Sequence, residues 1–495
     1  MGLQVVLATA EALPFAKVGG LADVAGALPR ELARLGARVT LVMPAYRAIE
    51  RARFDLRPVE RVSGGTVPVG ARLEPWRLES ARMPDADVEV LFVGGSLFER
   101  DGIYTDPHTG RAFPDEAERW IFFCRAALAA LRALGRRPDV LHLNDFHTAL
   151  AAAYLRQPEA AAGLQGAASL LSIHNLGYQG LFDARLFPLT GLPAWYMAPL
   201  APLEFWGRMN FMKAGLVLSD ALSTVSPTYA REIQGSDEFG YGLQGVLRER
   251  SDDLFGILNG IDDGVWNPSL DPLIAARYDC GDPAPKETCK RALLERVGLP
   301  YEAHTPVFGC ISRLADQKGF DLLLAALPRL LERGLQLVVL GSGQREYESA
   351  LLGATREHPR QVSVTLTFDD ALAHAIEAGC DFFLMPSRYE PCGLNQMYSL
   401  KYGTVPVVRQ TGGLADTVQE WNPARREGNG FVFAPYTPEA LRDAVERALA
   451  AFADPHSMRR LRLAGMGADF SWTRSARRYL DVYERAMARH LTRAR

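Results

Sequence analysis

The chain has 495 residues, of which 48% are hydrophobic and 23% charged, and its net charge is −3 at pH 7. This length predicts two domains rather than one. The small net charge provides no basic field for a nucleic acid, so no nucleic-acid partner is expected. The longest apolar stretches, residues 126–131 and 335–340, are far shorter than the roughly 20 residues of a membrane span, so no membrane partner is expected either.

The N-terminal sequence and the cysteines both favour a cytoplasmic protein. Residues 1–7 have no Lys or Arg before their apolar run, which continues into a glycine turn and therefore indicates a buried strand rather than a signal peptide. The six cysteines form no CxxC pair and are spread over a long chain, which argues against a disulfide framework or a zinc site. A reducing cytoplasm fits this pattern.

Short β-rich runs alternate with longer helical patterns, which is typical of a parallel α/β fold. In the first half the predicted strands are residues 5–9, 39–43, 88–93, 140–143 and 170–173, with helices such as 21–35 and 116–134 between them. In the second half they are residues 307–311, 337–340, 362–366, 381–385 and 405–408. The chain is therefore predicted to fold into two doubly wound parallel sheets in tandem.

The expected domains are residues 1–255 and 262–470, with the hinge in the Gly-, Pro- and Asp-rich stretch between the two sheets. Residues 471–495 form a helical pattern that is expected to pack back across the hinge. Ligands collect at the carboxyl ends of parallel strands, so the active site is predicted in a deep cleft between the domains. The sequence leaves a homo-oligomer open.

Gly-Gly-Leu-Ala-Asp occurs twice, at residues 19–23 behind Lys17 and at residues 412–416 behind Thr411. Each copy follows an apolar run and precedes a helical pattern, so backbone N–H groups at a helix start are offered to an anion without a Cβ in the way. The first copy makes Gly19, Gly20 and Asp23 candidates for binding the substrate. The alternative is a pair of ordinary strand-to-helix turns.

Arg313 and Lys318 follow the predicted strand 307–311 and bring two cations to its end. Arg offers a planar fork to phosphate oxygens and Lys a point charge, which suits a diphosphate. The alternative is a solvated helix start, although cations there oppose the helix dipole.

Glu390 follows the predicted strand 381–385, and Gly393 and Leu394 open the next helix beside it. Carboxylates hydrogen-bond sugar hydroxyls well and can steady an oxocarbenium-like transition state. The alternative is a carboxylate that caps the helix. Cys392 is predicted to be a packed backbone donor rather than a nucleophile, because no basic residue closely follows it.

Among the histidines, His174 ends the strand 170–173 and is expected to face the cleft. His142 is expected to pack within its strand, and His147 to cap the next helix. No HxxxH or paired-carboxylate motif occurs, and the spacing Asp85-Ala86-Asp87 suits a turn. We therefore predict that the protein needs neither a metal ion nor a cofactor.

Five motifs in this order resemble bacterial glycogen synthase and plant starch synthase nearly end to end. They lie at residues 17–24, 174–175, 312–319, 390–394, and 401–404 with 411–416. The resemblance implies the GT-B fold, two Rossmann-like domains facing a deep cleft. It also implies transfer of glucose from ADP-glucose to the non-reducing 4-OH of an α-1,4-glucan, with retention at the anomeric carbon, in glycogen biosynthesis.

The resemblance also implies roles for individual residues. Contacts to donor phosphates and to the acceptor side are implied for Lys17, Gly19 and Gly20, and a clamp on the leaving diphosphate for Arg313 and Lys318. Sugar contacts are implied for His174 at the 6-OH, Glu390 at the 3-OH and Asn259. Asp145 resembles the acidic residue on the acceptor or reaction side, and Phe368 the aromatic ring that stacks on adenine.

The chain departs from the family pattern at three positions. Val18 and Asn395 each stand where Thr is common, and Phe368 stands where Tyr is frequent, so hydroxyl contacts are lost while the stacking ring is kept. Tyr398 stands where related transferases carry a second Glu for the ribose, which counts against the sucrose-synthase type. A front-face substitution without a covalent glycosyl-enzyme is expected.

Four alternatives stay open at this point. A UDP-sugar transferase would share the architecture, and a glucan-binding regulatory protein would have an inactive cleft. A dehydrogenase is disfavoured because no GxGxxG with an acidic residue about 20 positions later follows the first strand. A phosphorylase would need a lysine for pyridoxal phosphate, which pattern alone does not exclude.

Overall fold

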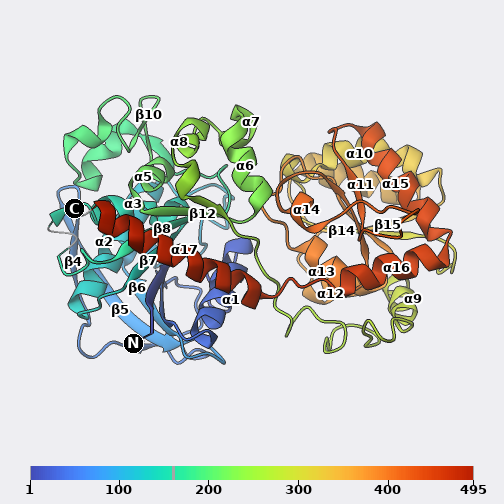
Figure 1. Ribbon diagram of the computed structural model, residues 1–495, viewed down its shortest axis with the longest axis horizontal. Helices are drawn as coiled ribbons and strands as arrows, with labels where there is room; N and C mark the ends of the chain where they lie inside the picture. Colours follow the sequence, from blue (N-terminus) through green and yellow to red (C-terminus); the bar gives the residue numbers. More distant parts are fainter. Residues whose placement is uncertain (1, 159–161, 494–495) are drawn as a thin grey trace. The chain divides into compact units, whose positions relative to one another are not determined.

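The alternating pattern folds into two α/β units in the computed structural model, which describes residues 2–158 and 162–493. The N-terminal unit comprises Met1–Val225, Ala230–Ile257 and Trp472–Arg495, and the C-terminal unit comprises Ser226–Tyr229 and Leu258–Ser471. Apart from the short segment Ser226–Tyr229, the chain passes from one unit to the other after Ile257, within the predicted hinge, and again after Ser471. Figure 1 shows both units with their elements labelled.

The sheet of the N-terminal unit has the order β13-β12-β8-β7-β1-β2-β6-β5-β3, with β4 paired to β5. Its strands from β13 to β6 run parallel. They are β1 (Gln4–Ala8), β2 (Arg38–Pro44), β6 (Glu89–Gly94), β7 (Val140–Asn144), β8 (Ala168–Ile173), β12 (Ala221–Thr224) and β13 (Leu254–Gly256). Strands β7 and β8 are buried along their whole length, as expected of parallel strands covered on both faces.

The prediction of a wholly parallel sheet is wrong at one edge of this unit. There β3 (Arg57–Pro58), β4 (Gly64–Val69) and β5 (Arg72–Arg82) run antiparallel. In β5, Trp76 and Leu78 are buried between partly exposed neighbours. One face of the strand therefore packs while the other stays partly solvated, which is the pattern of an antiparallel edge.

Helices cover both faces of this sheet, and a small antiparallel sheet lies beside them. The helices are α1 (Gly20–Arg34), α2 (Glu116–Ala133), α3 (Asp145–Tyr154), α5 (Phe211–Leu218), α6 (Pro227–Gly235), α7 (Asp237–Gly240), α8 (Gln244–Glu249) and α17 (Trp472–Arg493). The small sheet consists of β9 (Leu181–Asp183), β10 (Glu204–Phe205) and β11 (Arg208–Asn210). In the described part of the chain, no helix is long and apolar enough to cross a bilayer.

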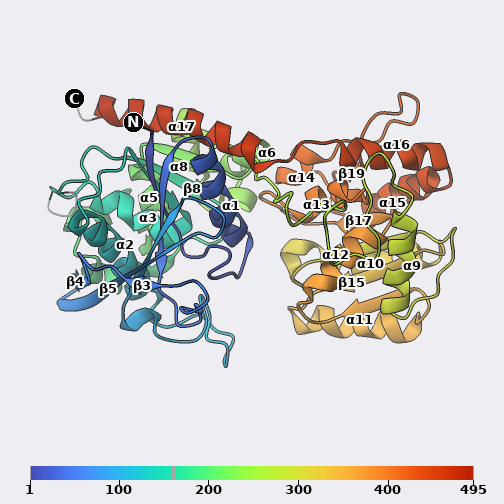
Figure 2. The same ribbon diagram turned by 90° about the horizontal axis from the view of Figure 1, so that it is seen from below.

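The last helix, α17, packs against α1 and β8 of the N-terminal unit, along which it runs in Figure 2. Thr473 donates to Glu31 with an Oγ1–Oε2 distance of 2.8 Å, and the Tyr483 hydroxyl lies 2.9 Å from His142 Nδ1. His142 is fully buried and also contacts Ser172, which confirms that it packs within its strand.

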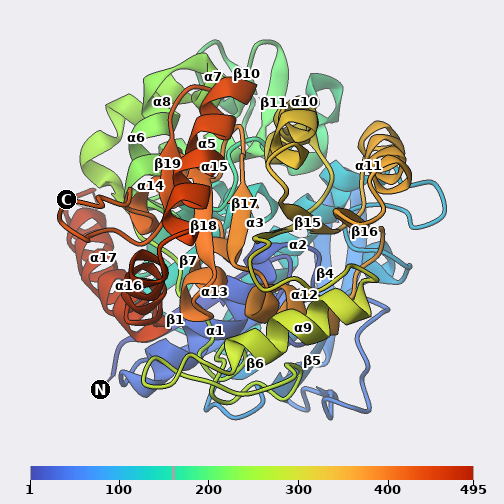
Figure 3. The ribbon, with the colours of Figure 1, turned by 90° about the vertical axis from the view of Figure 1, so that its right-hand side faces the viewer.

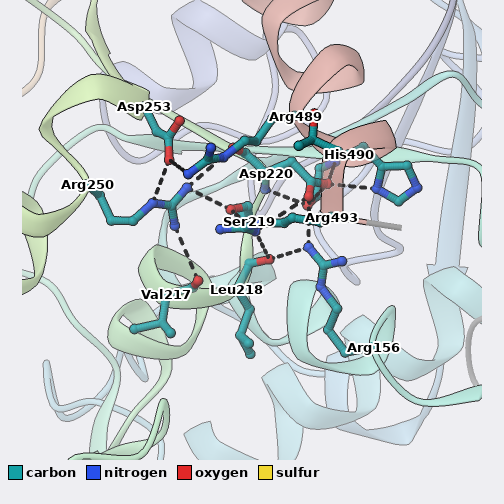
Figure 4. A network of polar contacts seen from close by, with 12 residues as sticks. Arg156, Val217, Leu218, Ser219, Asp220, Arg250, Asp253, Arg489, His490 and Arg493 are labelled. Atoms are coloured by element: carbon teal, nitrogen blue, oxygen red, sulfur yellow. Dashed lines mark hydrogen bonds and ion pairs between the residues drawn. The ribbon is translucent and has the colours of Figure 1, made fainter. Parts of the chain in front are cut away.

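The C-terminal end of α17 is held by a polar network that Figure 4 shows. Arg489 forms an ion pair with Asp253, and His490 Nδ1 lies 3.2 Å from an oxygen of the buried Asp220. Arg493 donates to the carbonyl of Ser219 just after α5. Arg493 thus meets the negative end of the α5 dipole.

The sheet of the C-terminal unit is parallel throughout, in the order β16-β15-β14-β17-β18-β19. Its strands are β14 (Val307–Ile311), β15 (Gln336–Leu340), β16 (Val362–Thr365), β17 (Phe382–Met385), β18 (Val405–Arg409) and β19 (Phe431–Phe433). Its helices are α9 (Lys286–Arg296), α10 (Phe320–Leu331), α11 (Arg345–Glu357), α12 (Asp370–Gly379), α13 (Asn395–Lys401), α14 (Gly412–Thr417), α15 (Pro438–Phe452) and α16 (Pro455–Met466).

Two apolar cores lie on the two faces of this sheet, between the helix layers visible in Figure 3. Successive side chains of a strand point to opposite faces. Phe308 therefore joins the core with α10 and α15, while its neighbour Val307 joins the core with α9 and α12.

Each sheet has one point where the chain order reverses direction. In the N-terminal unit it lies between β1 and β7, and in the C-terminal unit between β14 and β17. A crevice forms at the carboxyl ends of the strands at such a switch point, and ligands bind there. These two sheet edges are where the functional residues are expected.

Candidate functional site

In the N-terminal unit, the switch point brings together Asn144, Asp145 and His174. Asn144 ends β7, Asp145 begins α3, and His174 follows β8. The backbone N–H of His174 donates to Asp145 Oδ1 over 2.8 Å, and His174 Nε2 lies 2.8 Å from Asn144 Oδ1. Two of the predicted catalytic residues, Asp145 and His174, thus contact each other directly.

The hydrogen bonds of Asn144 determine which nitrogen of His174 carries the proton. Asn144 Nδ2 donates to the carbonyl of Ala8 at the end of β1 over 3.0 Å, so Oδ1 is the amide atom that faces the imidazole. An oxygen accepts only, and His174 must therefore donate from Nε2. Burial lowers the pKa of His174 to about 4, so the ring is neutral at pH 7 and Nδ1 keeps a lone pair.

Asp145 combines backbone strain with burial. Its φ of 55° lies in the left-handed region, which residues other than glycine seldom adopt. Its pKa is raised to about 7 by burial, against the lowering effect of the backbone N–H groups of His174 and Asn175. A carboxyl group that titrates near neutral pH is suited to proton transfer, and strained residues persist where the surroundings hold them for function.

Both Gly-Gly turns begin helices, α1 and α14, as the sequence predicted. In the first turn the N–H groups of Val18 and Gly19 donate to Glu11 Oε2, and Tyr104 donates to Glu11 Oε1 over 3.0 Å. The sequence analysis missed Glu11. A Glu directly after the apolar first strand and before a Gly-Gly turn was the available signal.

The other residues of the first turn lie close to solvent. The Lys17 ammonium pairs with Asp23 over 2.8 Å and is partly exposed. Gly20 is the first residue of α1. Lys17 is therefore in place at the turn, while Glu11 already holds two of the amide groups that could bind a phosphate.

In the C-terminal unit, the switch point brings Lys318 and Glu390 together. Lys318 Nζ lies 2.6 Å from Glu390 Oε2, and the hydroxyl of Ser387 donates to the same oxygen over 3.0 Å. Gly319 permits this approach, since a Cβ there would lie 2.1 Å from the carbonyl oxygen of Pro386. The ion pair is largely buried, which strengthens it relative to a surface pair.

The remaining predicted residues of this edge differ in exposure. Arg313 is exposed, and within the described residues no ion-pair partner is found for it. Asn395 begins α13 and donates from Nδ2 to the carbonyl of Ile311, which ties β14 to this helix. Gly393 has a φ of 71°, and Leu394 is the N-cap residue of α13.

Cys392 is buried, and burial raises the pKa of its thiol to about 12. The backbone N–H of Asn259 hydrogen-bonds to this sulfur. Asn259 is itself buried, and within the described structure its Oδ1 has no hydrogen-bond partner. A buried, unsatisfied amide oxygen is a candidate contact for a ligand hydroxyl.

The second Gly-Gly turn serves backbone packing. A Cβ on Gly412 would lie 1.9 Å from the carbonyl oxygen of Glu390, and one on Gly413 would lie 2.0 Å from that of Cys392. Gly413 also donates its N–H to the carbonyls of Glu390 and Pro391. These glycines thus hold the segment that carries Glu390.

Two further predictions meet contrasting outcomes. The ring of Phe368 is 84% exposed just before α12, so it is free to stack on a planar ligand. His147 was expected to cap a helix, and this is wrong: it lies within α3 and packs against Trp120 and Tyr104 at ring-centroid distances of 4.6 and 4.9 Å. The imidazole is buried against these two aromatic rings instead of binding the N–H groups at the helix start.

Comparison with known proteins gives the family. The family model "Starch synthase catalytic domain" matches residues 4–249, and "Glycosyl transferases group 1" matches residues 296–461. The glycogen synthase of Anaeromyxobacter dehalogenans is 50% identical over 484 residues, covering 97% of this chain and 99% of the relative. The chain belongs to the glycogen synthase family. The glycogen synthase of Thermotoga maritima is 45% identical over 495 residues, covering 98% and 99% of the two chains.

Solved structures agree with this family. The catalytic domain of starch synthase IV from Arabidopsis thaliana, bound to ADP and acarbose, superposes with a TM-score of 0.90 at 34% identity, over 99% of this chain and 100% of that one. Sucrose-phosphate synthase from Thermosynechococcus elongatus shares the fold, with a TM-score of 0.60 at 18% identity over 98% and 99% of the two chains. The predicted GT-B fold class is confirmed.

Proposed function

We propose that this member of the glycogen synthase family transfers glucose from ADP-glucose to the non-reducing 4-OH of an α-1,4-glucan, with retention of configuration. The observation that carries the proposal is the Lys318–Glu390 ion pair at the switch point of the C-terminal unit. A fixed ammonium suits the diphosphate of a nucleotide sugar, and a carboxylate beside it suits the sugar hydroxyls.

The C-terminal edge would hold the donor. When the diphosphate binds, its oxygens compete with Glu390 for the Lys318 ammonium, and the exposed Arg313 adds a second cation. Glu390 keeps its bond from Ser387 and gains freedom to accept from the glucosyl 3-OH. Asn259 Oδ1 and the exposed ring of Phe368 are the proposed further contacts, to the sugar and to the adenine.

The N-terminal edge would hold neutral hydroxyl groups. The Nδ1 lone pair of His174 accepts a hydrogen bond from the glucosyl 6-OH, because the tautomer leaves no hydrogen on that atom. Asp145 lies beside it with a pKa near neutrality and faces the acceptor side. Lys17 and the turn of Gly19 and Gly20 contribute at the start of α1.

The proposed reaction is a front-face substitution. The bond between the glucosyl anomeric carbon and the diphosphate oxygen breaks, and the acceptor 4-oxygen forms its bond to that carbon from the same face. The acceptor hydroxyl proton passes to the departing diphosphate. Lys318 and Arg313 stabilise the negative charge that develops on the leaving group. Isolation of a glucosylated side chain would contradict this pathway.

The deciding experiment measures release of nucleoside diphosphate from ADP-glucose and UDP-glucose, each with and without glycogen, in buffer containing EDTA. Glycogen-dependent ADP release in EDTA is expected, since the described residues bring no three His, Cys, Asp or Glu side chains into a metal-binding group. A preference for UDP-glucose would support the rival transferase, and no release from either donor would support a non-catalytic glucan-binding protein.

Retention is tested on the product. Proton NMR of a maltooligosaccharide extended by one unit should show the coupling of a new α-linkage, and glucoamylase should remove that unit. A β-linkage would contradict the proposal. A cytoplasmic location is proposed with it, because all six cysteines are unpaired in the described structure.

A further inference from the structure

The hairpin formed by β10 and β11 has an unusual residue at its tip. Phe205 pairs with Arg208, so Trp206 and Gly207 make a two-residue turn, with φ values of 52° and 76°. Left-handed φ at both positions is the pattern of a type I′ turn, for which Asn-Gly is strongly preferred. Trp is a poor choice there, because its bulky side chain makes the left-handed conformation costly.

The hairpin and the segment before it expose two large apolar side chains. The side chain of Trp206 is 83% exposed, and that of Leu200, which precedes β10 and also has a left-handed φ of 67°, is 91% exposed. Two strained residues that also leave apolar surface in water have no structural benefit of their own. Such outliers are typical of positions that contact a ligand.

The base of the hairpin is held rigidly. The buried ammonium of Lys213 donates to the carbonyls of Ala201 and Glu204, and burial lowers its pKa. Asn210 Nδ2 donates to Gln179 Oε1 over 2.7 Å. A rigid base fixes the backbone that carries Trp206 before any ligand arrives, which reduces the entropy lost on binding.

The hairpin is also tied to the loop that begins at His174. Phe211, directly after β11, donates its N–H to the carbonyl of Gly180 over 3.1 Å. Tyr178 lies between His174 and Gly180 on this loop and is 53% exposed. The base of the hairpin is therefore joined to the loop that follows His174, and β10 lies at the outer edge of the N-terminal unit in Figure 1.

The chemistry around Trp206 selects a carbohydrate. The neighbouring charges balance, with Glu204 and Asp183 against Arg208 and Arg185, so there is no basic field for a nucleic acid or an anionic membrane. One Trp ring covers at most about 250 Å², whereas a stable protein interface needs about 800 Å² on each partner. An aromatic face flanked by polar side chains matches a pyranose ring, which has apolar C–H faces and a rim of hydroxyls.

We propose that Trp206 is a stacking platform for a glucosyl unit of the glucan, forming a polymer-binding site on the N-terminal unit beyond the reacting residues. The choice of glucan rests on the proposed function. A long chain held here stays near the enzyme between turnovers, while a short acceptor does not reach both places.

The test compares Trp206→Asn with Trp206→Tyr. Asn is the favoured residue of this turn, so Trp206→Asn should keep or raise the melting temperature while glycogen affinity falls about tenfold. Trp206→Tyr should retain most of the affinity. The matched control is Leu73→Ala, because Leu73 is also an exposed apolar residue of this unit but lies in β5.

Two readouts separate this inference from the proposed function. Affinity electrophoresis in glycogen-containing gels needs no donor, so it reports binding even if the protein transfers nothing. With ADP-glucose, the KM for glycogen should rise about tenfold at unchanged kcat, and both constants for maltotriose should stay unchanged. The proposal would be overturned if Trp206→Asn migrated like the wild type in glycogen-containing gels. It would also be overturned if Leu73→Ala lost as much affinity for glycogen.

Discussion

The two switch points hold carboxylates in opposite electrostatic states. In the C-terminal unit, Glu390 lies against the ammonium of Lys318 at 2.6 Å. In the N-terminal unit, Asp145 accepts from backbone N–H groups alone among the partners recorded for it in the described residues, and burial raises its pKa to about 7. The same sheet geometry thus presents a fixed ion pair in one unit and a nearly neutral acid in the other.

This difference assigns the two ends of a nucleotide sugar. A diphosphate carries charge that must be neutralised as it leaves, and the C-terminal switch point offers it the largely buried ammonium of Lys318. A hydroxyl group carries no charge to neutralise, and the neutral imidazole of His174, held by Asn144, can accept its hydrogen bond. The two edges differ in the partners and burial of their carboxylates, although each lies at the switch point of parallel strands.

Removal of the Lys318 ammonium should have the largest effect of the changes predicted here. Lys318→Ala is expected to lower kcat for ADP release by roughly 10²–10³, because the leaving diphosphate loses its buried charge partner. Lys318→Gln keeps a donor for Glu390 but carries no charge, so it should lose the rate to a similar extent while folding normally. Arg329→Ala on α10 is the control, as Arg329 is an exposed cation of the same unit. Near-wild-type turnover of Lys318→Gln would contradict the charge argument.

Removal of the acid should act in opposite directions on activity and stability. Asp145→Asn is expected to lower kcat by about 10²-fold, because the acceptor loses a carboxylate that would orient it. The folded pKa of Asp145, about 7, lies above the ordinary Asp value of 3.8. The folded state therefore binds this proton more tightly, and stability is lost as pH rises from about 4 to about 7. At pH 8, Asp145→Asn should melt at a higher temperature than the wild type. Its free energy of unfolding should be larger by on the order of 1 kcal/mol or more.

This stability gain should vanish near pH 4, where both proteins are uncharged at the site. Scanning calorimetry at pH 4.5 and pH 8 measures the difference. Asp55→Asn is the matched control, because Asp55 also has a left-handed φ, of 49°, but is exposed and pairs with Arg57. A variant Asp145→Asn that melts lower at pH 8 would show that the ionised carboxylate stabilises the fold.

A smaller effect is expected from a substitution that adds a charge beside His174 in the N-terminal unit. Asn144→Asp places a carboxylate beside His174 Nε2, which raises the pKa of the imidazole from about 4 toward neutrality. Protonated His174 has no lone pair on Nδ1, so kcat/KM should fall about tenfold at pH 6 while changing less at pH 8. A pH profile from 5 to 9 measures the shift, and an unchanged acidic limb would show that the tautomer of His174 does not matter.

The sequence predicted elements best where residues are buried on both sides. The predicted strand 307–311 coincides with β14, because a parallel strand covered on both faces is a continuous apolar run. Strands β3 to β5 were missed because a half-solvated edge has mixed polarity. The β10–β11 hairpin was missed because its turn carries Trp206 in place of the usual Asn.

The candidate site was predictable only as residue types at strand ends. Spacing placed Lys318 and Glu390 after two strands, but their contact depends on Gly319 approaching Pro386 across the sheet. The state of Asp145 could not be predicted, since burial and two backbone N–H groups from another loop determine it. Glu11 was missed for the same reason. Its partners, the N–H groups of Val18 and Gly19, come within hydrogen-bonding distance only when the first turn folds back on β1.

The smallest expected effect concerns the thiol beside Glu390. Cys392 is buried and its pKa is about 12, so only about one molecule in 10⁴ carries a thiolate there at pH 8. Cys280 is exposed. Iodoacetamide at pH 8 should therefore label Cys280 and leave ADP release unchanged, and Cys392→Ser should keep turnover within about twofold of the wild type. Mass spectrometry of tryptic peptides locates the label. Loss of activity together with alkylation of Cys392 would indicate that Cys392 acts as a nucleophile at the C-terminal edge. The division into an edge that stabilises charge and an edge that binds hydroxyl groups would then be wrong.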